Sequence, residues 1–375
     1  MAGRGVAKAL RRGESTLETA TRSKLCHRRT FISTSFCQRH GAVPEFSETT
    51  SSELDDVLST FRSKVFLPAH LSKAHRDLIY GSKNRKVLDE DPLKVEIAGE
   101  EFYLGHLDRT KDQPNSAKGL LQAVTLMKDK KDWDNLPIFF EGLKTAKRTI
   151  KTCHLEKVVR KAGNAGRQDT ILECARRVSK TGFALKDAGL VREIMWWLQY
   201  KAASSTWDPS QTQKALSMAE QVAILLEDER HSGQRVVKGI QDVKIRPEVV
   251  GILLELAAAH AKQKGTGDAD GKVTTYADKL ISIMKDDRDL RTALPVEDGW
   301  DARNNWLRFV SPIIYGLRTA GEVLENASTR KELFAIASIL GDRAAKEREL
   351  LVGGKAAEKT SLGLWAYTNL VGSKS

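Results

Sequence analysis

Residues 155–185 have the sequence LEKVVRKAGNAGRQDTILECARRVSKTGFAL, and this stretch decides the fold. In each half, apolar side chains recur every three or four residues, which predicts two amphipathic helices. Gly163 and Gly166 lie between the halves and Gly182 lies near the end, so we expect a helix, a short turn, a second helix and a connector. Because a helix pair of this size cannot bury both of its faces alone, it must stack on a neighbouring pair.

The same pattern recurs at intervals of 35 residues, and Leu120, Leu155 and Leu190 occupy equivalent positions in three successive units. Other positions that align at this interval are Trp133 with Gln168, Leu136 with Ile171, Phe139 with Cys174, Phe140 with Ala175, Leu143 with Val178, and Ile150 with Leu185. The sequence therefore predicts a mostly α fold of stacked antiparallel helix pairs, an α-solenoid with a 35-residue period.

The period, the glycine-containing turn and the glycine near the end of the unit resemble a pentatricopeptide-type repeat. The related tetratricopeptide repeat has a period of about 34 residues. The resemblance covers residues 120–202 and is to the degenerate repeats of organellar RNA-binding proteins and of mitochondrion-specific ribosomal proteins. It implies association with RNA or with the ribosome, whereas the spacing alone fits a protein-binding solenoid equally well.

Helical patterns extend on both sides of these units, although residues 204–210 lengthen the loop of the third unit and the fixed interval is lost after residue 230. The predicted helices cover residues 53–64, 71–80, 119–130, 134–148, 155–164, 168–181, 189–202, 211–228, 246–263, 274–287, 301–320, 328–347 and 357–370. We expect four parts: a transit peptide at 1–38, an N-terminal extension at 39–118, a helical-repeat domain at 119–347, and a C-terminal helix and tail at 348–375.

A small β-hairpin is predicted within the N-terminal extension. Leu93, Val95 and Ile97 alternate with polar residues, and Phe102 and Leu104 do so after a possible turn at Ala98-Gly99. Alternation with a period of two on both sides of a turn is typical of two paired strands with one buried face.

The first 38 residues have the composition of a mitochondrial transit peptide. They contain eight basic and two acidic residues with frequent Ser and Thr, and residues 6–12 can form a short cationic amphipathic helix. Residues 29–38 resemble a two-step cleavage pattern, which would leave a mature chain beginning near Arg39 in the mitochondrial matrix. The alternative is a basic arm that stays attached and binds RNA.

The composition of the 375 residues excludes several classes of protein. Four cysteines exclude a disulfide scaffold, and the best apolar run, residues 249–260, is too short for a membrane span and contains Glu255. Cys153 and Cys174, which would remain after cleavage, are expected to be buried thiols. The net charge of +12 falls to +6 without residues 1–38, so the mature chain stays basic.

Basic residues are concentrated where the repeat is clearest. Between Lys144 and Lys201 there are 14 basic and five acidic residues, a local balance of +9. Such a patch attracts polyanions because phosphate neutralisation releases counterions. The candidate RNA-binding residues are Lys144, Lys147, Arg148, Lys151, Lys157, Arg160, Lys161, Arg167, Arg176, Arg177 and Lys180.

Their spacing predicts ridges on helix faces. Lys157, Arg160 and Lys161 lie at i, i+3 and i+4, and two similar ridges precede and follow them at 144–151 and 176–180. Ridges on stacked pairs would form one continuous basic stripe that contacts the phosphates and shape of a folded RNA. The alternative is the solvated face of ordinary surface helices. On the RNA hypothesis, reversing Arg160, Lys161, Arg176 and Arg177 to Glu abolishes RNA association and leaves folding intact.

No other motif suggests chemistry. Trp196-Trp197 is expected to pack between repeats, and Cys153-His154 with Cys174 lacks the spacing of a zinc site. The stretch at 265–272 has neither a phosphate-loop pattern nor the Glu that a calcium loop needs. We find no catalytic constellation, so we predict no enzyme, no cofactor and no metal.

These patterns favour a structural, RNA-associated component of the mitochondrial ribosome. The expected partners are ribosomal RNA or other mitochondrial RNA and mitochondrial ribosomal proteins, with no membrane span. Two alternatives remain open: a mitochondrial RNA-processing or translation factor, and an assembly factor for a respiratory complex that uses the solenoid to bind protein.

Overall fold

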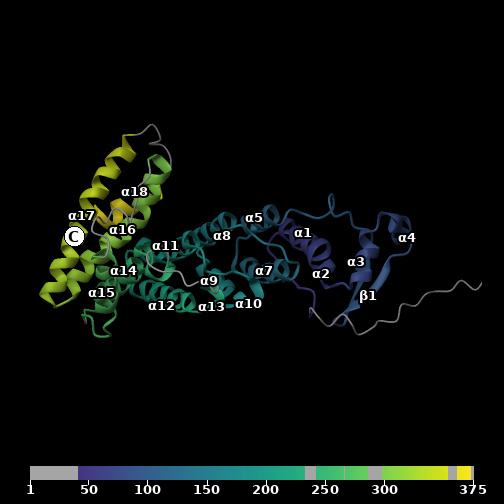
Figure 1. Cartoon of the computed structure of the whole chain (residues 1–375), viewed down its shortest axis with the longest axis horizontal. Helices are drawn as coiled ribbons and strands as arrows, with labels where there is room; N and C mark the ends of the chain where they lie inside the picture. Colours follow the sequence, from purple (N-terminus) through teal and green to yellow (C-terminus); the bar gives the residue numbers. More distant parts are fainter. Residues whose placement is uncertain (1–40, 233–241, 266, 286–297, 354–360, 373–375) are drawn as a thin grey trace, which may run out of the picture. The chain divides into compact units, whose positions relative to one another are not determined.

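The computed structural model describes residues 41–232, 242–265, 267–285, 298–353 and 361–372. The predicted transit peptide at 1–38 lies outside the described residues. Within them the chain is mostly helical, with one small sheet (Figure 1).

The N-terminal extension begins with a nearly continuous helical stretch. It consists of α1 (Ser52–Phe61), a π-helical segment (Arg62–Phe66) and α2 (Leu67–His70). Its first part confirms the helix predicted at 53–64, and Leu54, Leu58 and Phe61 form the buried face. The helices α3 (Lys73–Tyr80) and α4 (Arg85–Glu90) follow, and the sequence pattern did not predict α4.

The predicted hairpin is confirmed. β1 (Leu93–Ile97) pairs antiparallel with β2 (Glu100–Leu104), with Val95 opposite Phe102. Ala98 and Gly99 both have positive φ, at 52° and 89°, as a tight two-residue hairpin turn requires. Val95, Ile97, Phe102 and Leu104 are buried and join the main core.

The predicted repeats form helix pairs stacked in two layers. The first layer contains α5 (Ser116–Leu126), α8 (Thr152–Asn164) and α11 (Ala188–Ser204), and each contacts the next. The second layer contains α7 (Asn135–Thr145), α9 (Gln168–Arg176), α10 (Val178–Thr181) and α12 (Pro209–Leu226). The short α6 (Lys130–Trp133) precedes α7. Figure 1 shows the two layers side by side.

Positions that align in the sequence are buried alike in the structure. Leu136 and Ile171 are both buried, and so are Leu143 and Val178. Close approach between successive units explains one of the repeat's glycines, because a Cβ atom on Gly163 of α8 would lie 2.1 Å from the ring of Trp197 on α11. In these units, the 35-residue interval therefore relates positions that are buried alike in successive helix pairs.

The stacking continues after residue 230 with longer helices. The later elements are α13 (Glu229–Ser232), α14 (Pro247–Lys264), α15 (Lys272–Lys285), α16 (Trp300–Val323), α17 (Ala327–Val352), α18 (Leu362–Ala366) and a π-helical segment (Tyr367–Val371). α14 contacts α11, α12, α15 and α16, and α17 packs on α15 and α16. With 24 residues in α16 and 26 in α17, these helices are too long for the earlier interval, which explains why it could not be followed.

α14 is buried on almost every side, and it contains the apolar run at 249–260. Helices that are apolar all round belong to the interior of a protein or of a membrane. Among the described residues, no helix combines the length and apolarity that crossing a membrane would need.

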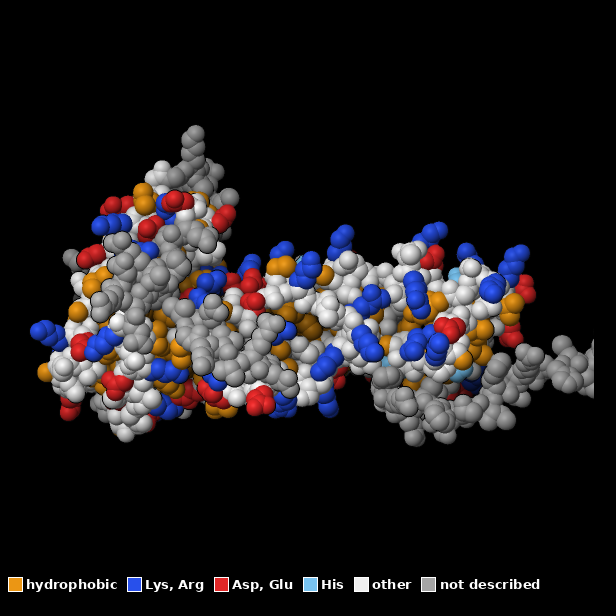
Figure 2. All heavy atoms as spheres, viewed as in Figure 1, with side chains coloured by type: hydrophobic (Ala, Val, Ile, Leu, Met, Phe, Trp, Pro, Cys, Tyr) orange, Lys and Arg blue, Asp and Glu red, His pale blue; other side chains and the backbone are white. Residues whose placement is uncertain are grey.

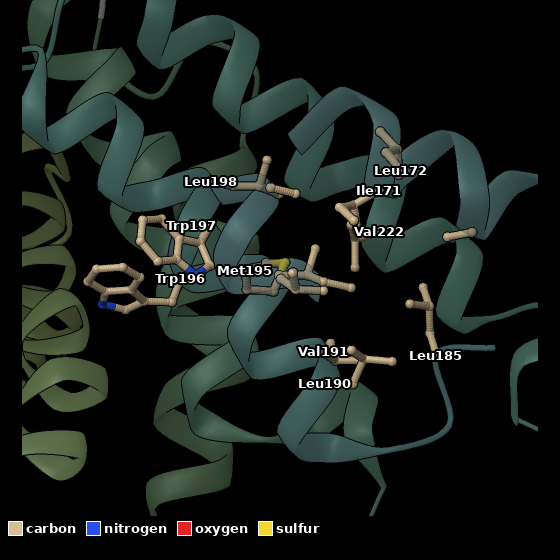
Figure 3. Close-up of a cluster of buried hydrophobic side chains, with 14 of the residues drawn as sticks. Ile171, Leu172, Leu185, Leu190, Val191, Met195, Trp196, Trp197, Leu198 and Val222 are labelled. Atoms are coloured by element: carbon tan, nitrogen blue, oxygen red, sulfur yellow. The ribbon is translucent and has the colours of Figure 1, made fainter. Parts of the chain in front are cut away.

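The tryptophan pair lies in the core, as predicted. Trp196 and Trp197 are 0% and 2% exposed, and Figure 3 shows them among Val191, Met195 and Leu198. The Trp196 indole Nε1 donates a hydrogen bond to the backbone oxygen of Arg308, 3.0 Å away on α16. The pair thus joins the repeats to the C-terminal helices and offers no surface for stacking on bases.

Several predicted boundaries differ from the structure. The helix predicted at 134–148 is preceded by α6 and ends at Thr145, and the one predicted at 168–181 breaks at Arg177, whose φ of −92° and ψ of 28° are not helical. The last helix begins at Leu362, and residues 357–360 of the range predicted for it lie outside the described residues.

Candidate nucleic-acid interface

The eleven predicted RNA-binding residues fall on three adjacent pieces of the repeat. Four lie at the end of α7 and in the connector that leads to α8, three lie on α8, and four lie on the turn before α9 and on α9 and α10. In this order they are Lys144, Lys147, Arg148 and Lys151; Lys157, Arg160 and Lys161; and Arg167, Arg176, Arg177 and Lys180.

On α8, two of the three predicted residues share an exposed face. Lys157 and Lys161 are exposed, while Val158 and Val159 are buried on the opposite side. Arg160 instead lies partly buried, with its guanidinium 3.2 Å from Glu156 and 3.4 Å from Glu193 of α11. Arg160 therefore stabilises the contact between neighbouring first-layer helices.

Arg176 at the end of α9 and Arg177, which follows it, are also engaged within the fold. Arg177 forms an ion pair with Glu141 of α7, in the preceding unit. Arg176 lies 3.5 Å from Glu173 and donates a hydrogen bond to Gln221 of α12, in the following unit. These two arginines connect three successive helices of the second layer.

Lys144 at the end of α7 and Arg148 in the connector are engaged as well. The Lys144 ammonium donates to the backbone oxygens of Val178 and Ser179 at 3.1 Å and 2.6 Å. The Arg148 guanidinium donates to Gln113 Oε1 at 2.5 Å. These three bonds each join segments about one repeat apart.

Five lysines remain available to a partner. They are exposed, and none forms an ion pair with any residue that the structure describes: Lys147, Lys151, Lys157, Lys161 and Lys180. Arginine forms multidentate pairs with carboxylates, whereas lysine is a flexible, strongly hydrated charge, so this division between the two residue types has a physical basis. We call these five residues the lysine surface.

The lysine surface is not the single stripe that the sequence suggested. α8 belongs to the first layer and α10 to the second, so the ridge on α8 and the residue on α10 lie on different layers. Lys147 and Lys151 lie in the connector from α7 to α8, which joins the two layers and so connects the two parts of the lysine surface. In Figure 2, Lys and Arg side chains predominate over the part of this face that α1, α5, α7 and α8 occupy.

Two exposed lysines outside the predicted set extend this surface. Lys186, between α10 and α11, lies 35 residues after Lys151 and occupies the equivalent connector. Lys118 of α5 lies 35 residues before Cys153, on the exposed side of the first layer. For Lys186, which aligns with Lys151, the repeat interval was the signal that could have identified it.

The structure contradicts the expectation that both cysteines are buried. Cys174 is buried, and burial raises the pKa of its thiol, but Cys153 is exposed. Cys153 precedes Lys157 and Lys161 by four and eight residues, which places it on the same outward face of α8. Among the residues described, no group of three or more His, Cys, Asp or Glu side chains could hold a metal ion.

The arrangement also changes the expected result of charge reversal. Because Arg160 and Arg177 face Glu193 and Glu141, glutamate at either position would place like charges together in half-buried contacts. Folding would then be weakened, contrary to the sequence-based expectation. The lysine surface is the appropriate target for substitution.

Comparison with known proteins gives two matches that span the chain. The family model for mitochondrial ribosomal protein mS27 matches residues 29–369. The chain is also similar to the small ribosomal subunit protein mS27 of Neurospora crassa, with 28% identity over 397 aligned positions that cover all of both chains. Together with the helical scaffold, the family match leads to one conclusion: the chain belongs to the mitochondrial ribosomal protein mS27 family, whose members are structural components of the ribosome and not enzymes.

Proposed function

We propose that this protein is a resident structural component of the small subunit of the mitochondrial ribosome, in the mitochondrial matrix. Family membership supports residence in the ribosome, and the name of the Neurospora crassa relative supports the small subunit. The composition of residues 1–38 supports import into the matrix. The stacked helix pairs act as a scaffold that joins ribosomal RNA to neighbouring proteins.

The lysine surface is the observation that supports contact with ribosomal RNA. A lysine that already pairs with a carboxylate gains little from a phosphate, but these five side chains have no acidic partner among the described residues. Each contact with a phosphate would release condensed counterions, which favours binding at low salt. The neighbouring arginines hold the helices on which these lysines are displayed.

The mode of contact follows from which side chains are buried. Phe139 and Phe140 of α7 and Trp196 and Trp197 of α11 are buried in the core. Stacking on unpaired bases, which sequence-specific RNA recognition commonly uses, is therefore not available from these residues. Contact with phosphates and with the shape of a folded RNA fits the lysine surface better.

The hairpin region is the proposed contact for a neighbouring protein. Tyr103 on the outer face of β2 is 67% exposed, and Val87 on the nearby α4 is 66% exposed. Contiguous exposed apolar surface marks protein interaction sites, and these two side chains are the apolar groups that a partner would cover here.

The experiment that tests RNA contact compares two variants of the full chain. In the first, all five residues of the lysine surface are changed to Gln. In the control, five exposed lysines from elsewhere are changed to Gln, which leaves the same net charge: Lys83, Lys86, Lys279, Lys331 and Lys346. Binding to a transcript of the small-subunit ribosomal RNA is measured at a fixed moderate salt concentration.

We expect the first variant to bind more than about ten-fold more weakly than the unmodified chain, because phosphate contacts supply most of such affinity. The affinity of the control variant should fall much less. Equal reductions in affinity for the two variants would show that only net charge matters and that the lysine surface is not the contact.

A further inference from the structure

A small cavity lies where α8 turns into α9. This end of the helix pair is away from the connector between α7 and α8 that carries Lys147 and Lys151. α9, α11 and α12 surround it, and its volume is about 90 Å³. Since roughly 10–15 Å³ suffices for one water, the cavity has room for a group of several heavy atoms. Leu198 and Met218 contribute apolar lining, and charged side chains complete it.

The charged lining is strongly cationic. Arg167, Lys201 and Lys214 contribute three positive charges, and Asp169 contributes one negative charge. The Arg167 guanidinium lies 2.8 Å from Asp169, but its Nε atom is buried and has no hydrogen-bond partner among the described residues. Among the described residues, the Lys201 ammonium donates a hydrogen bond only to the backbone oxygen of Gly166, at 3.2 Å. The cavity therefore has a surplus of hydrogen-bond donors as well as of positive charge.

The three cations also repel one another. Burial lowers the pKa of Lys201, and the charges of Lys214 and Arg167 lower it further. Lys214 forms no ion pair with a described residue. An anion placed among the three groups would remove this repulsion.

The backbone adds to the positive potential. α9 begins at Gln168, beside the cavity, and no described side chain caps its first turn. Free N–H groups at a helix N-terminus carry a partial positive charge. The helix end thus reinforces the three side chains.

We propose that this cavity is a binding site for a phosphate group, held by Arg167, Lys201 and Lys214. The phosphate belongs either to RNA or to a small phosphorylated molecule, and the same groups would hold both. Arg167 is the member of the predicted RNA-binding set that lies here, while Lys201 and Lys214 are new assignments. The site does not depend on the lysine surface, because none of those five lysines lines the cavity.

Thermal unfolding of the full chain tests this proposal. Tm is measured with increasing inorganic phosphate against sodium chloride at equal ionic strength, and then with adenosine monophosphate and with the phosphodiester ApA. A ligand that binds only the folded chain raises Tm in a saturating manner. We expect a rise of roughly 1–3 °C with inorganic phosphate.

Variants then locate the site. Lys201→Gln with Lys214→Gln should abolish the rise, and the exposed Lys214→Gln alone should weaken it at little cost to the fold. The matched pair Lys157→Gln with Lys161→Gln, which removes the same charge from the lysine surface, should retain it. Stabilisation by ApA as well as by adenosine monophosphate would identify RNA backbone as the source, and stabilisation by adenosine monophosphate without ApA would identify a terminal phosphate.

The proposal fails if none of the three compounds raises Tm, or if the double variant at Lys201 and Lys214 keeps the full rise. Failure of this kind is distinct from failure of the RNA contact, because the lysine-surface variant is scored by binding to the ribosomal RNA transcript. Each result can therefore occur without the other.

Discussion

Arg308 on α16 and Glu193 on α11 form a bidentate ion pair in the core, although 115 residues separate them. The distances are 3.0 Å from Nη1 to Oε1 and 2.7 Å from Nη2 to Oε2. The guanidinium also lies 3.9 Å from the ring centroid of Trp196. Burial lowers the pKa of Arg308, and the charge of Glu193 opposes this effect. The buried guanidinium therefore depends on Glu193 to stabilise its charge. The pair fixes the C-terminal helices to the predicted repeats.

Removing one partner of this pair should destabilise the chain strongly. Glu193→Gln leaves the buried Arg308 charge without compensation, which costs about 3–5 kcal/mol. The double variant Glu193→Leu with Arg308→Leu should recover much of that stability, because an apolar pair needs no compensation. Chemical unfolding monitored by circular dichroism measures both. A Glu193→Gln chain as stable as the unmodified one would show that the pair does not hold the two regions together.

Burial of Glu255 predicts a pH dependence. Burial raises the pKa of this carboxyl well above its ordinary value, and its only hydrogen bond among the described residues comes from Gln199. When the pH rises above the ordinary pKa of a glutamate, Glu255 therefore loses its proton in the unfolded state but keeps it in the folded state. The free energy of unfolding therefore falls as the pH rises above that ordinary value, and it continues to fall until the pH reaches the pKa of Glu255 in the folded chain.

Glu255→Gln tests this dependence because the amide is neutral at every pH and can still accept the bond from Gln199. We expect the variant to be more stable than the unmodified chain at pH 8 and to differ from it less at pH 5. Unfolding free energies at the two pH values measure the difference. An identical pH dependence in the two chains would mean that Glu255 does not take up a proton on folding.

The stacking of successive units predicts a cost at Gly163. A Cβ atom there would meet the Trp197 ring at 2.1 Å, so Gly163→Ala should destabilise the chain by about 1–3 kcal/mol through overpacking. Gly105→Ala is the matched control, since nothing lies within 4 Å of the added atom. Equal unfolding midpoints for the two variants would contradict the close approach of α8 and α11.

Neutralisation of phosphates by lysine predicts how salt affects RNA binding. The slope of log K against log salt should fall by about 0.7–0.9 for each phosphate that the chain no longer neutralises. Lys161→Gln should therefore reduce the slope by nearly one unit, whereas the control Lys331→Gln should leave it unchanged. Filter binding over a range of salt concentrations gives both slopes, and an unchanged slope for Lys161→Gln would remove this residue from the RNA-binding surface.

The parts that the sequence predicted well are the local ones. The helix pairs around Leu120, Leu155 and Leu190 and the hairpin at Val95 and Phe102 follow from side-chain periods that a single segment carries. The family match confirms the prediction of a mitochondrial ribosomal protein that is not an enzyme. The 35-residue interval could not be followed into α16 and α17, because helices of this length no longer fit a unit of 35 residues.

The parts that could not be predicted depend on distant residues. Whether an arginine is free or paired is decided by carboxylates in other units, such as Glu141 opposite Arg177 and Glu193 opposite Arg308. The cavity at Arg167 likewise forms only when Lys201 and Lys214 come from the next helix pair. Net charge and spacing indicated the region of the proposed RNA contact, but ion pairs across units determine which of its basic residues have no acidic partner among the described residues.

Sedimentation of a mitochondrial lysate tests the central claim most directly. The chain is followed by immunoblotting on sucrose gradients with and without EDTA, which separates the ribosomal subunits. Our account predicts that it travels with the intact ribosome and then stays with the small subunit after EDTA treatment. Sedimentation with the large subunit, or at the top of both gradients, would contradict residence in the small subunit.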